Sequence, residues 1–98
     1  MKILIYGANG WIGKQFVNIL NIQKISYIVG VARVDDTVAL SEELKTICPS
    51  HVISFIGRTH GFIHEKPYPT IDYLEQPGKL TENIRDNLFS PLSLAMLC

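Results

Sequence analysis

A glycine-rich turn directly after a short apolar run is the feature that most constrains the fold of this 98-residue chain. Residues 2–6 are almost entirely apolar, and glycines follow at Gly7, Gly10 and Gly13. Such a run without alternation is typical of a strand buried on both faces of a parallel sheet. The first glycine permits a tight turn, the second lets backbone approach a pyrophosphate, and the third lets helix and strand pack closely. The pattern predicts a dinucleotide-binding unit, with a purely structural turn as the alternative.

The following residues alternate between helical and strand patterns. Apolar residues at helical spacing follow the glycines, and residues 26–31 and 51–56 predict a second and a third strand. Thr37 or Ser41 is expected to cap a second helix. This helix ends before Pro49, because proline disfavours a helical conformation in the residue that precedes it. This order predicts a Rossmann-like α/β fold, a parallel sheet with helices on both faces, as the N-terminal half (βαβαβα) of a doubly wound fold.

A final helical pattern runs from Thr81 to Cys98. In a sheet of order 3-2-1-4-5-6 nothing in the chain supplies strands 4 to 6, so the first strand is expected at an open edge. We therefore expect residues 1–98 to be the NAD(P)-binding portion of a longer, truncated domain, with a partner chain covering the edge as the alternative. The last helix is expected to bury an apolar stripe, namely Ile84, Leu88 and Leu92.

Residues 57–80 contain three prolines and three glycines. Long loops within compact domains are uncommon and usually functional, so this segment is expected to be a loop on the substrate side of the site. Its two histidines, His60 and His64, lie in a glycine-bearing segment rather than on one helix face, and no metal site is expected.

Charge and cysteine content exclude several classes of function. Nine basic residues balance nine acidic ones without any basic cluster, which argues against nucleic-acid binding and against contact with an anionic membrane. No apolar run approaches the ~18–20 residues of a membrane-spanning helix. Two cysteines 50 residues apart favour neither a disulfide framework nor a zinc site, so a cytoplasmic location is expected.

The end of the second strand selects the cofactor. An acidic residue there binds the ribose hydroxyls of NAD, whereas an arginine accommodates the 2′-phosphate of NADP. Arg33 lies twenty residues after Gly13, with Asp35 and Asp36 just beyond it. NADPH is therefore the expected cofactor and NADH the alternative. A solvated turn whose charges touch nothing is the other interpretation of this segment.

Three segments carry a resemblance to a known family. GANGWIG after an apolar strand resembles the GxxGxxG loop of the extended short-chain dehydrogenase/reductases. HVISFIGRTHG and TIDYLEQPGKLTENIRDNL are similar to the dTDP-4-dehydrorhamnose reductase group, above all to its UDP-rhamnose synthase (3,5-epimerase/4-reductase) type. The resemblance spans essentially the whole chain and corresponds to the N-terminal cofactor-binding portion of that family.

The resemblance implies the NADP(H)-binding part of a sugar-nucleotide 4-keto reductase or epimerase-reductase. The product would be an activated 6-deoxyhexose, UDP- or dTDP-L-rhamnose, made from a nucleotide-bound 4-keto-6-deoxyhexose, and a homodimer of the full-length protein is left open. The residues expected to contact the cofactor are Gly7, Asn9, Gly10, Trp11, Ile12, Gly13, Arg33, Phe55, Ile56 and Gly57. Arg58, Thr59 and His60 are expected to face the substrate.

Asn87 resembles a helix asparagine that supports the active centre of these enzymes. Because Pro91 has no amide hydrogen, the carbonyl of Asn87 lacks its helical donor. We hypothesise that this carbonyl holds a water molecule in a proton relay.

The catalytic Tyr-x-x-x-Lys pair of the family is absent from this chain. Four residues after its tyrosines stand Gly10, Val31, Asp72 and Pro77. No catalytic residue is therefore assigned, and the sequence leaves open whether the chain is an enzyme by itself. A non-catalytic dinucleotide-binding module and an inactive truncated product are the alternatives.

Overall fold

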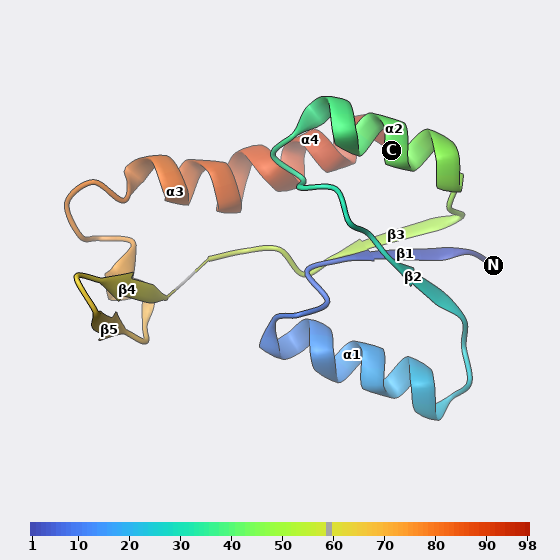
Figure 1. Ribbon diagram of the computed structural model, residues 1–98, viewed down its shortest axis with the longest axis horizontal. Helices are drawn as coiled ribbons and strands as arrows, with labels where there is room; N and C mark the ends of the chain where they lie inside the picture. Colours follow the sequence, from blue (N-terminus) through green and yellow to red (C-terminus); the bar gives the residue numbers. More distant parts are fainter. Residues whose placement is uncertain (59) are drawn as a thin grey trace.

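A parallel three-stranded sheet forms the centre of the molecule. The computed structural model describes residues 1–58 and 60–98. Strands β1 (Ile3–Tyr6), β2 (Tyr27–Val29) and β3 (His51–Ser54) lie in the order β2-β1-β3, and both pairs are parallel (Figure 1). The predicted α/β class is confirmed.

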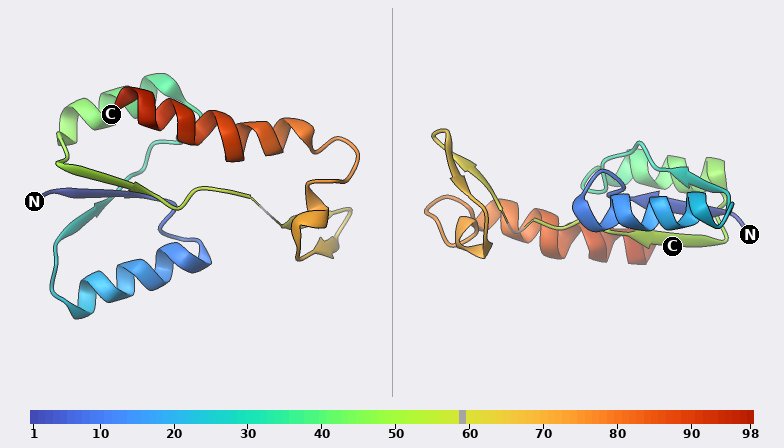
Figure 2. Two further views of the ribbon diagram at one scale, coloured as in Figure 1. Left: turned by 180° about the vertical axis from the view of Figure 1, so that it is seen from behind. Right: turned by 90° about the horizontal axis from the view of Figure 1, so that it is seen from below.

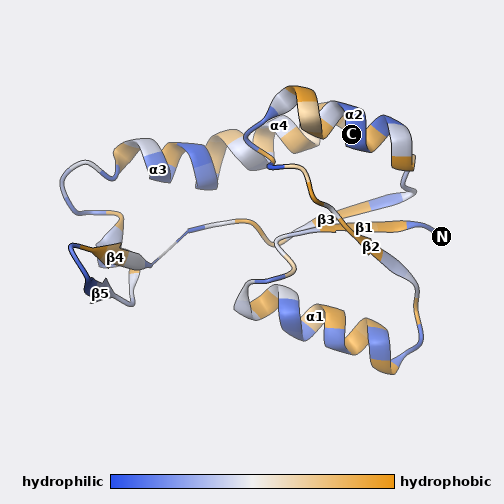
Figure 3. Cartoon of the chain, viewed as in Figure 1, coloured by the Kyte–Doolittle hydropathy of each residue, from blue (hydrophilic) through white to orange (hydrophobic). Residues whose placement is uncertain are grey.

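Helices cover both faces of this sheet, as predicted. Helix α1 (Trp11–Ile22) lies on one face, and α2 (Thr37–Ile47) lies on the other beside the C-terminal helix (Figure 1). All four residues of β1 are buried. Because side chains alternate along a strand, Ile3 and Ile5 pack with Leu20 of α1, whereas Leu4 and Tyr6 pack against the opposite helical layer. Strand β1 is accordingly hydrophobic along nearly its whole length (Figure 3).

The prediction that the first strand lies at an open edge is wrong. β1 pairs with β2 on one side and with β3 on the other, so β2 and β3 are the edges of the described sheet. The connection through α1 crosses one face, and the connection through α2 crosses the other and returns the chain beyond β1. A strand that is apolar on both faces thereby gains two neighbouring strands and two helical layers.

The N-cap of helix α2 differs from the prediction. The cap is Asp36 rather than Thr37 or Ser41, and its side chain accepts a hydrogen bond from the amide of Ala39 at 3.2 Å. The helix ends at Ile47, and its C-cap Cys48 adopts a left-handed conformation with φ 49° directly before Pro49. The predicted stop at the proline is confirmed.

The segment 57–80, predicted as a loop, contains regular structure. Strands β4 (Gly61–Ile63) and β5 (Lys66–Tyr68) form an antiparallel hairpin, and the 3₁₀ turn η1 (Ile71–Tyr73) follows. The buried ring of Tyr73 packs on Gly61, where a Cβ would lie 2.6 Å from the ring. The hairpin projects away from the sheet (Figure 2), so it has its own small contact layer rather than a share of the main core.

A single C-terminal helix changes pitch in its middle. It consists of α3 (Leu80–Ile84), the π-helical turn η2 (Arg85–Phe89) and α4 (Ser90–Leu97). The amide of Ser90 donates to the carbonyl of Arg85, five residues earlier. Proline at 91 supplies no donor to the turn before it, and π turns of this kind are frequent at functional sites.

The apolar stripe predicted for this helix does not lie in the core. Ile84, Leu88 and Leu92 are 47%, 58% and 53% exposed. Ser90 and Leu94 are buried instead, because a small side chain lets the helix approach the sheet closely. None of the helices in the described part of the chain combines the length and apolarity needed to cross a membrane.

Substituting Gly13 by alanine should destabilise the fold. A Cβ at this position would lie 2.2 Å from the carbonyl oxygen of Gly7 and 2.9 Å from Cα of Ala8, and both neighbours are backbone atoms. We expect Gly13→Ala to lower the free energy of unfolding by about 1–3 kcal/mol in urea denaturation.

Gly10→Ala is the matched control, because its Cβ would meet only the Gly7 carbonyl oxygen, at an ordinary 3.6 Å. Its cost should stay below about 1 kcal/mol, the usual range for a helix N-cap. Equal losses in the two variants would contradict close backbone packing at Gly13.

Candidate functional site

The carboxyl ends of β1 and β3 meet where the connections leave toward opposite faces of the sheet. Ligands of open α/β sheets bind at such a switch point. The loop after β1 turns at Gly7, which has φ +78°, and a Cβ there would lie 2.8 Å from the carbonyl carbon of Phe55. The predicted cofactor residues of the two loops are thus neighbours in space, and the amide of Phe55 donates to the carbonyl of Tyr6 at 2.8 Å.

The start of α1 presents free donors to this switch point. Gly10 is the N-cap and provides no side-chain hydrogen bond to the first turn of the helix. Asn9, Trp11 and Ile12 are exposed, with Trp11 80% accessible. Amides of a helix N-terminus that lack a side-chain acceptor fit a dinucleotide pyrophosphate. A dinucleotide therefore fits these residues.

A cavity of about 180 Å³ adjoins the glycine loop on the side of β2. Residues at or just after the ends of all three strands contribute to it. Its lining comprises Tyr6, Gly7, Gly30, Ala32, Arg33, Val34, Asp35, Ile56, Asp86 and Ser90. A larger cavity, about 490 Å³, lies along the free edge of β3 between α2 and α4, away from the glycine loop.

Glu43 of α2 holds the loop that carries Arg33. Its carboxylate accepts hydrogen bonds from the Tyr6 hydroxyl at 2.5 Å and from the amides of Val31 and Ala32 at 3.0–3.3 Å. The ring of Tyr6 also packs on Gly30, where a Cβ would approach within 2.2 Å. These contacts fix the backbone directly after β2.

These contacts move two pKa values in opposite directions. Burial and the hydrogen bond to Glu43 raise the pKa of Tyr6 far above its ordinary value. Partial burial opposes ionisation of Glu43, but the hydrogen bonds from Tyr6, Val31 and Ala32 together outweigh it and lower the pKa of this carboxyl.

Asn87 clamps the backbone that follows β3. Its side-chain oxygen accepts from the Arg58 amide at 2.8 Å, and its side-chain nitrogen donates to the Arg58 carbonyl at 2.9 Å and to Asn83 at 2.9 Å. Gly57 lies directly beside this contact. The side chain of Asn87 thus positions the candidate substrate-facing segment, while the water on its carbonyl stays a prediction.

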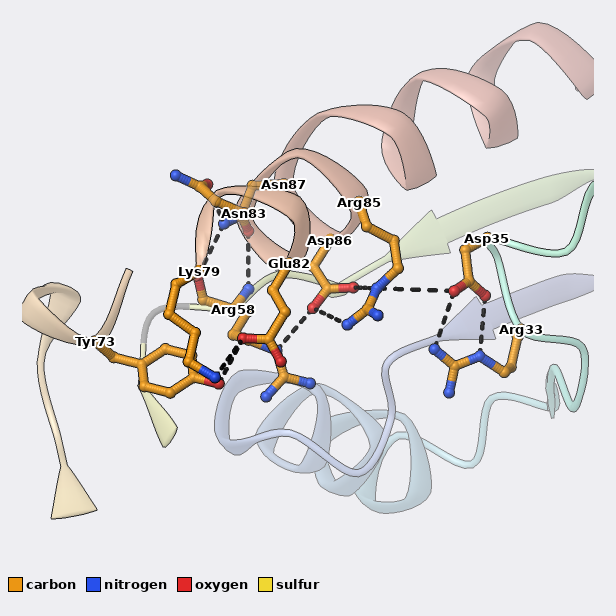
Figure 4. Close-up of polar contacts among 10 residues, drawn as sticks. All are labelled: Arg33, Asp35, Arg58, Tyr73, Lys79, Glu82, Asn83, Arg85, Asp86 and Asn87. Carbon is orange, nitrogen blue, oxygen red and sulfur yellow. Dashed lines mark hydrogen bonds and ion pairs between the residues drawn. The ribbon is translucent and has the colours of Figure 1, made fainter. Parts of the chain in front are cut away.

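A chain of alternating charges joins the two halves of the site (Figure 4). Asp86 binds Arg58 at 2.7 Å and Arg85 at 2.8 Å, and Asp35 binds Arg33 at 2.9 Å and Arg85 at 3.8 Å. Hydrogen bonds from arginine side chains lower the pKa of both aspartates, and the corresponding bonds raise the pKa of Arg33. Arg33 is therefore not in a solvated turn that touches nothing.

A second polar group ties the hairpin to α3. The hydroxyl of Tyr73 donates to Glu82 at 2.7 Å, and Lys79 pairs with Glu82 at 3.4 Å while lying 5.1 Å from the ring centre of Tyr73. The bond from Tyr73 lowers the pKa of Glu82. Tyr73 is therefore committed to packing and to a structural hydrogen bond.

The structure brings together the predicted residues of the glycine loop, Arg33, the 55–57 segment, Arg58 and Asn87. Thr59, predicted to face the substrate, lies outside the described residues. His60 is exposed next to the hairpin. Among the described residues, no group of three or more His, Cys, Asp or Glu side chains is placed to hold a metal ion.

Sequence reasoning missed three functional neighbours, Glu43, Arg85 and Asp86. Their contacts with Ala32, Arg58 and Asp35 join residues 11 to 50 positions apart, and no local pattern indicates such pairs. The arginine–aspartate alternation at 85–86 is the only signal in the sequence that could have pointed to them.

Comparison with known proteins identifies enzymes that are similar to this chain in sequence and in structure. No family model matches it. The L780 UDP-rhamnose synthase of Acanthamoeba polyphaga mimivirus is 50% identical over all 98 residues, and its crystal structure superimposes with a TM-score of 0.91. A bifunctional dTDP-4-dehydrorhamnose 3,5-epimerase/reductase of Arabidopsis thaliana is 33% identical over 97 residues.

The chain is homologous to the N-terminal region of these enzymes. It spans about a third of the length of the mimivirus UDP-rhamnose synthase, 33% of the crystallised chain, and 29% of the Arabidopsis enzyme. The fold is shared more widely. The dTDP-4-dehydrorhamnose reductase of Bacillus anthracis, solved in complex with NADP, has a TM-score of 0.73 at 19% identity and covers 98% of this chain and 31% of its own.

Replacing Asp86 should make stability less sensitive to acid. Because the folded state lowers the pKa of this carboxyl, its contribution is complete above the unfolded value of about 4 and is lost as pH falls through the folded value. We expect Asp86→Asn to cost about 1–2 kcal/mol at pH 7 and much less at pH 3, measured by urea unfolding.

The exposed Glu42→Gln is the control and should change stability little at either pH. A cost for Asp86→Asn that is the same at both pH values would rule out the ion pairs as its origin.

Proposed function

We propose that this chain is the NADP(H)-binding part of a sugar-nucleotide 4-keto reductase or epimerase-reductase that makes UDP- or dTDP-L-rhamnose. The observation that carries the proposal is the glycine loop at the centre of the sheet, with the amides of α1 open and Arg33 in the loop after β2. The 50% identity to the mimivirus UDP-rhamnose synthase supports the substrate class. Both cysteines are exposed and free, which fits a reducing compartment such as the cytoplasm.

Different residues around the switch point bind different parts of the dinucleotide and of the sugar nucleotide. The amides at the start of α1 bind the pyrophosphate, Arg33 binds the adenosine side, and residues 55–57 lie along the ribose and nicotinamide. Arg58 and His60 face the nucleotide sugar, a role that the family resemblance also implies for Thr59, and Asn87 fixes the backbone of Arg58. Bound NADPH supplies the hydride for the 4-keto carbon.

NADPH should bind this chain and quench Trp11, the one tryptophan, which lies in the loop. We expect saturable quenching in a fluorescence titration, tighter for NADPH than for NADH. Gly10→Ala adds a methyl group on the open side of the loop, so it should keep the fold and weaken binding at least about tenfold. A folded chain with no response to either dinucleotide would contradict the proposal.

A non-catalytic dinucleotide-binding module is the second candidate, because the glycine loop and the open amides of α1 serve binding by themselves. A chimera separates the two: this chain replaces the homologous region of the mimivirus UDP-rhamnose synthase. We expect UDP-rhamnose to form from UDP-4-keto-6-deoxyglucose with NADPH, and the same chimera carrying Gly10→Ala to be inactive. A chimera that binds NADPH without turnover would support the non-catalytic module.

A further inference from the structure

The carboxylate of Asp35 lies between two guanidinium groups that come from distant parts of the chain. Arg33 contacts it through two hydrogen bonds, Nε to Oδ1 at 2.9 Å and Nη2 to Oδ2 at 3.0 Å. Arg85 lies with its Nε 3.8 Å from Oδ2 (Figure 4). The carboxylate thus occupies a position between two cations at the wall of the 180 Å³ cavity.

The π turn η2 supplies the second cation, Arg85, which adjoins the cavity through its ion pairs with Asp35 and Asp86. Arg85 also binds Asp86, with its Nε 2.8 Å from Oδ1 and its Nη2 3.2 Å from Oδ2. Asp86 itself lines the cavity together with Arg33 and Asp35. Residues 33–35 and 85–86 therefore form one charged wall, although fifty residues separate them in the sequence.

The charges of this wall do not balance. The ion pairs join three guanidiniums, Arg33, Arg58 and Arg85, to two carboxylates, Asp35 and Asp86. Three other carboxylates of this region are engaged outside the ion pairs: Glu82 binds Tyr73 and Lys79, Glu43 binds Tyr6 and two amides, and Asp36 caps α2. Within the ion-paired set the guanidiniums outnumber the carboxylates by one. Planar guanidiniums also suit the paired oxygens of a phosphate.

We propose that Arg85 and Arg33 together bind the 2′-phosphate of NADPH, and that Asp35 is the internal anion which this phosphate displaces. The proposal rests on the proposed function, since it assigns the cofactor preference of the same site. The side chain of Arg33 is 72% exposed and is held by Asp35 alone, whereas Arg85 is also held by Asp86. A phosphate carries more negative charge than a carboxylate and replaces it between the two cations.

On this account the carboxylate of Asp35 weakens the binding of NADPH and has no effect on the binding of NADH. Removing its charge takes the competing anion away from both arginines, while Asp86 still positions Arg85. Asp35→Asn should therefore tighten NADPH binding about fivefold to tenfold. Removing a cation does the reverse, and Arg85→Gln should weaken NADPH binding by about the same factor. Neither variant should change the NADH dissociation constant more than about twofold.

The experiment measures the dissociation constants of NADPH and NADH for the wild-type chain, both variants and Lys45→Gln. Lys45 is an exposed cation in the last turn of α2, so its loss changes net charge as Arg85→Gln does without touching the site. Its NADPH-to-NADH ratio should equal that of the wild type. The inhibition constant of 2′-AMP, measured in competition with NADPH, should change among the variants in the same direction as the NADPH dissociation constant.

A gain of NADPH affinity in Asp35→Asn cannot come from unfolding. This variant therefore tests the competition between Asp35 and the 2′-phosphate even if Arg85→Gln does not fold. Unchanged NADPH-to-NADH ratios in both variants overturn the inference. A loss of NADH binding in Asp35→Asn with no gain for NADPH also overturns it, because Asp35 would then bind the ribose hydroxyls. A wild-type chain that binds neither dinucleotide refutes the proposed function, and this inference falls with it.

Discussion

Close contact between three backbone segments at Gly7 determines the arrangement of this site. A Cβ at Gly7 would lie 2.8 Å from the backbone of Phe55, and a Cβ at Gly13 would lie 2.2 Å from the carbonyl oxygen of Gly7. The end of β1, the start of α1 and the end of β3 thus meet without intervening side chains. The same absence of side chains leaves the amides of α1 open to a ligand, so packing and binding have one physical origin.

Long-range polar contacts position two segments that lie outside the backbone contact at Gly7, namely the loop after β2 and the backbone at Arg58. Glu43 fixes the loop after β2 through Tyr6 and two amides, and Asn87 fixes the backbone of Arg58 through both of its polar groups. In each case a helix residue satisfies main-chain groups at the carboxyl end of a strand. The chain thereby presents Arg33 and Arg58 from fixed backbone at the two ends of the site.

Local patterns predicted most of the fold and about half of the site. The apolar run and the glycine spacing predicted β1, the loop and α1, because each depends on neighbouring residues. The central place of β1 was not predicted, since strand order depends on which face each connection crosses. The contacts of Arg85 and Asp86 were missed for a similar reason. The hairpin within 57–80 depends on Tyr73 packing against Gly61, which composition alone does not indicate.

Amide chemical shifts of the isotope-labelled chain, recorded during addition of NADPH, test the central claim most directly. The account predicts the largest changes at residues 7–13, with further changes at 33–35 and 55–57. Changes confined to the hairpin or to the groove along the free edge of β3, with an unperturbed glycine loop, would contradict it.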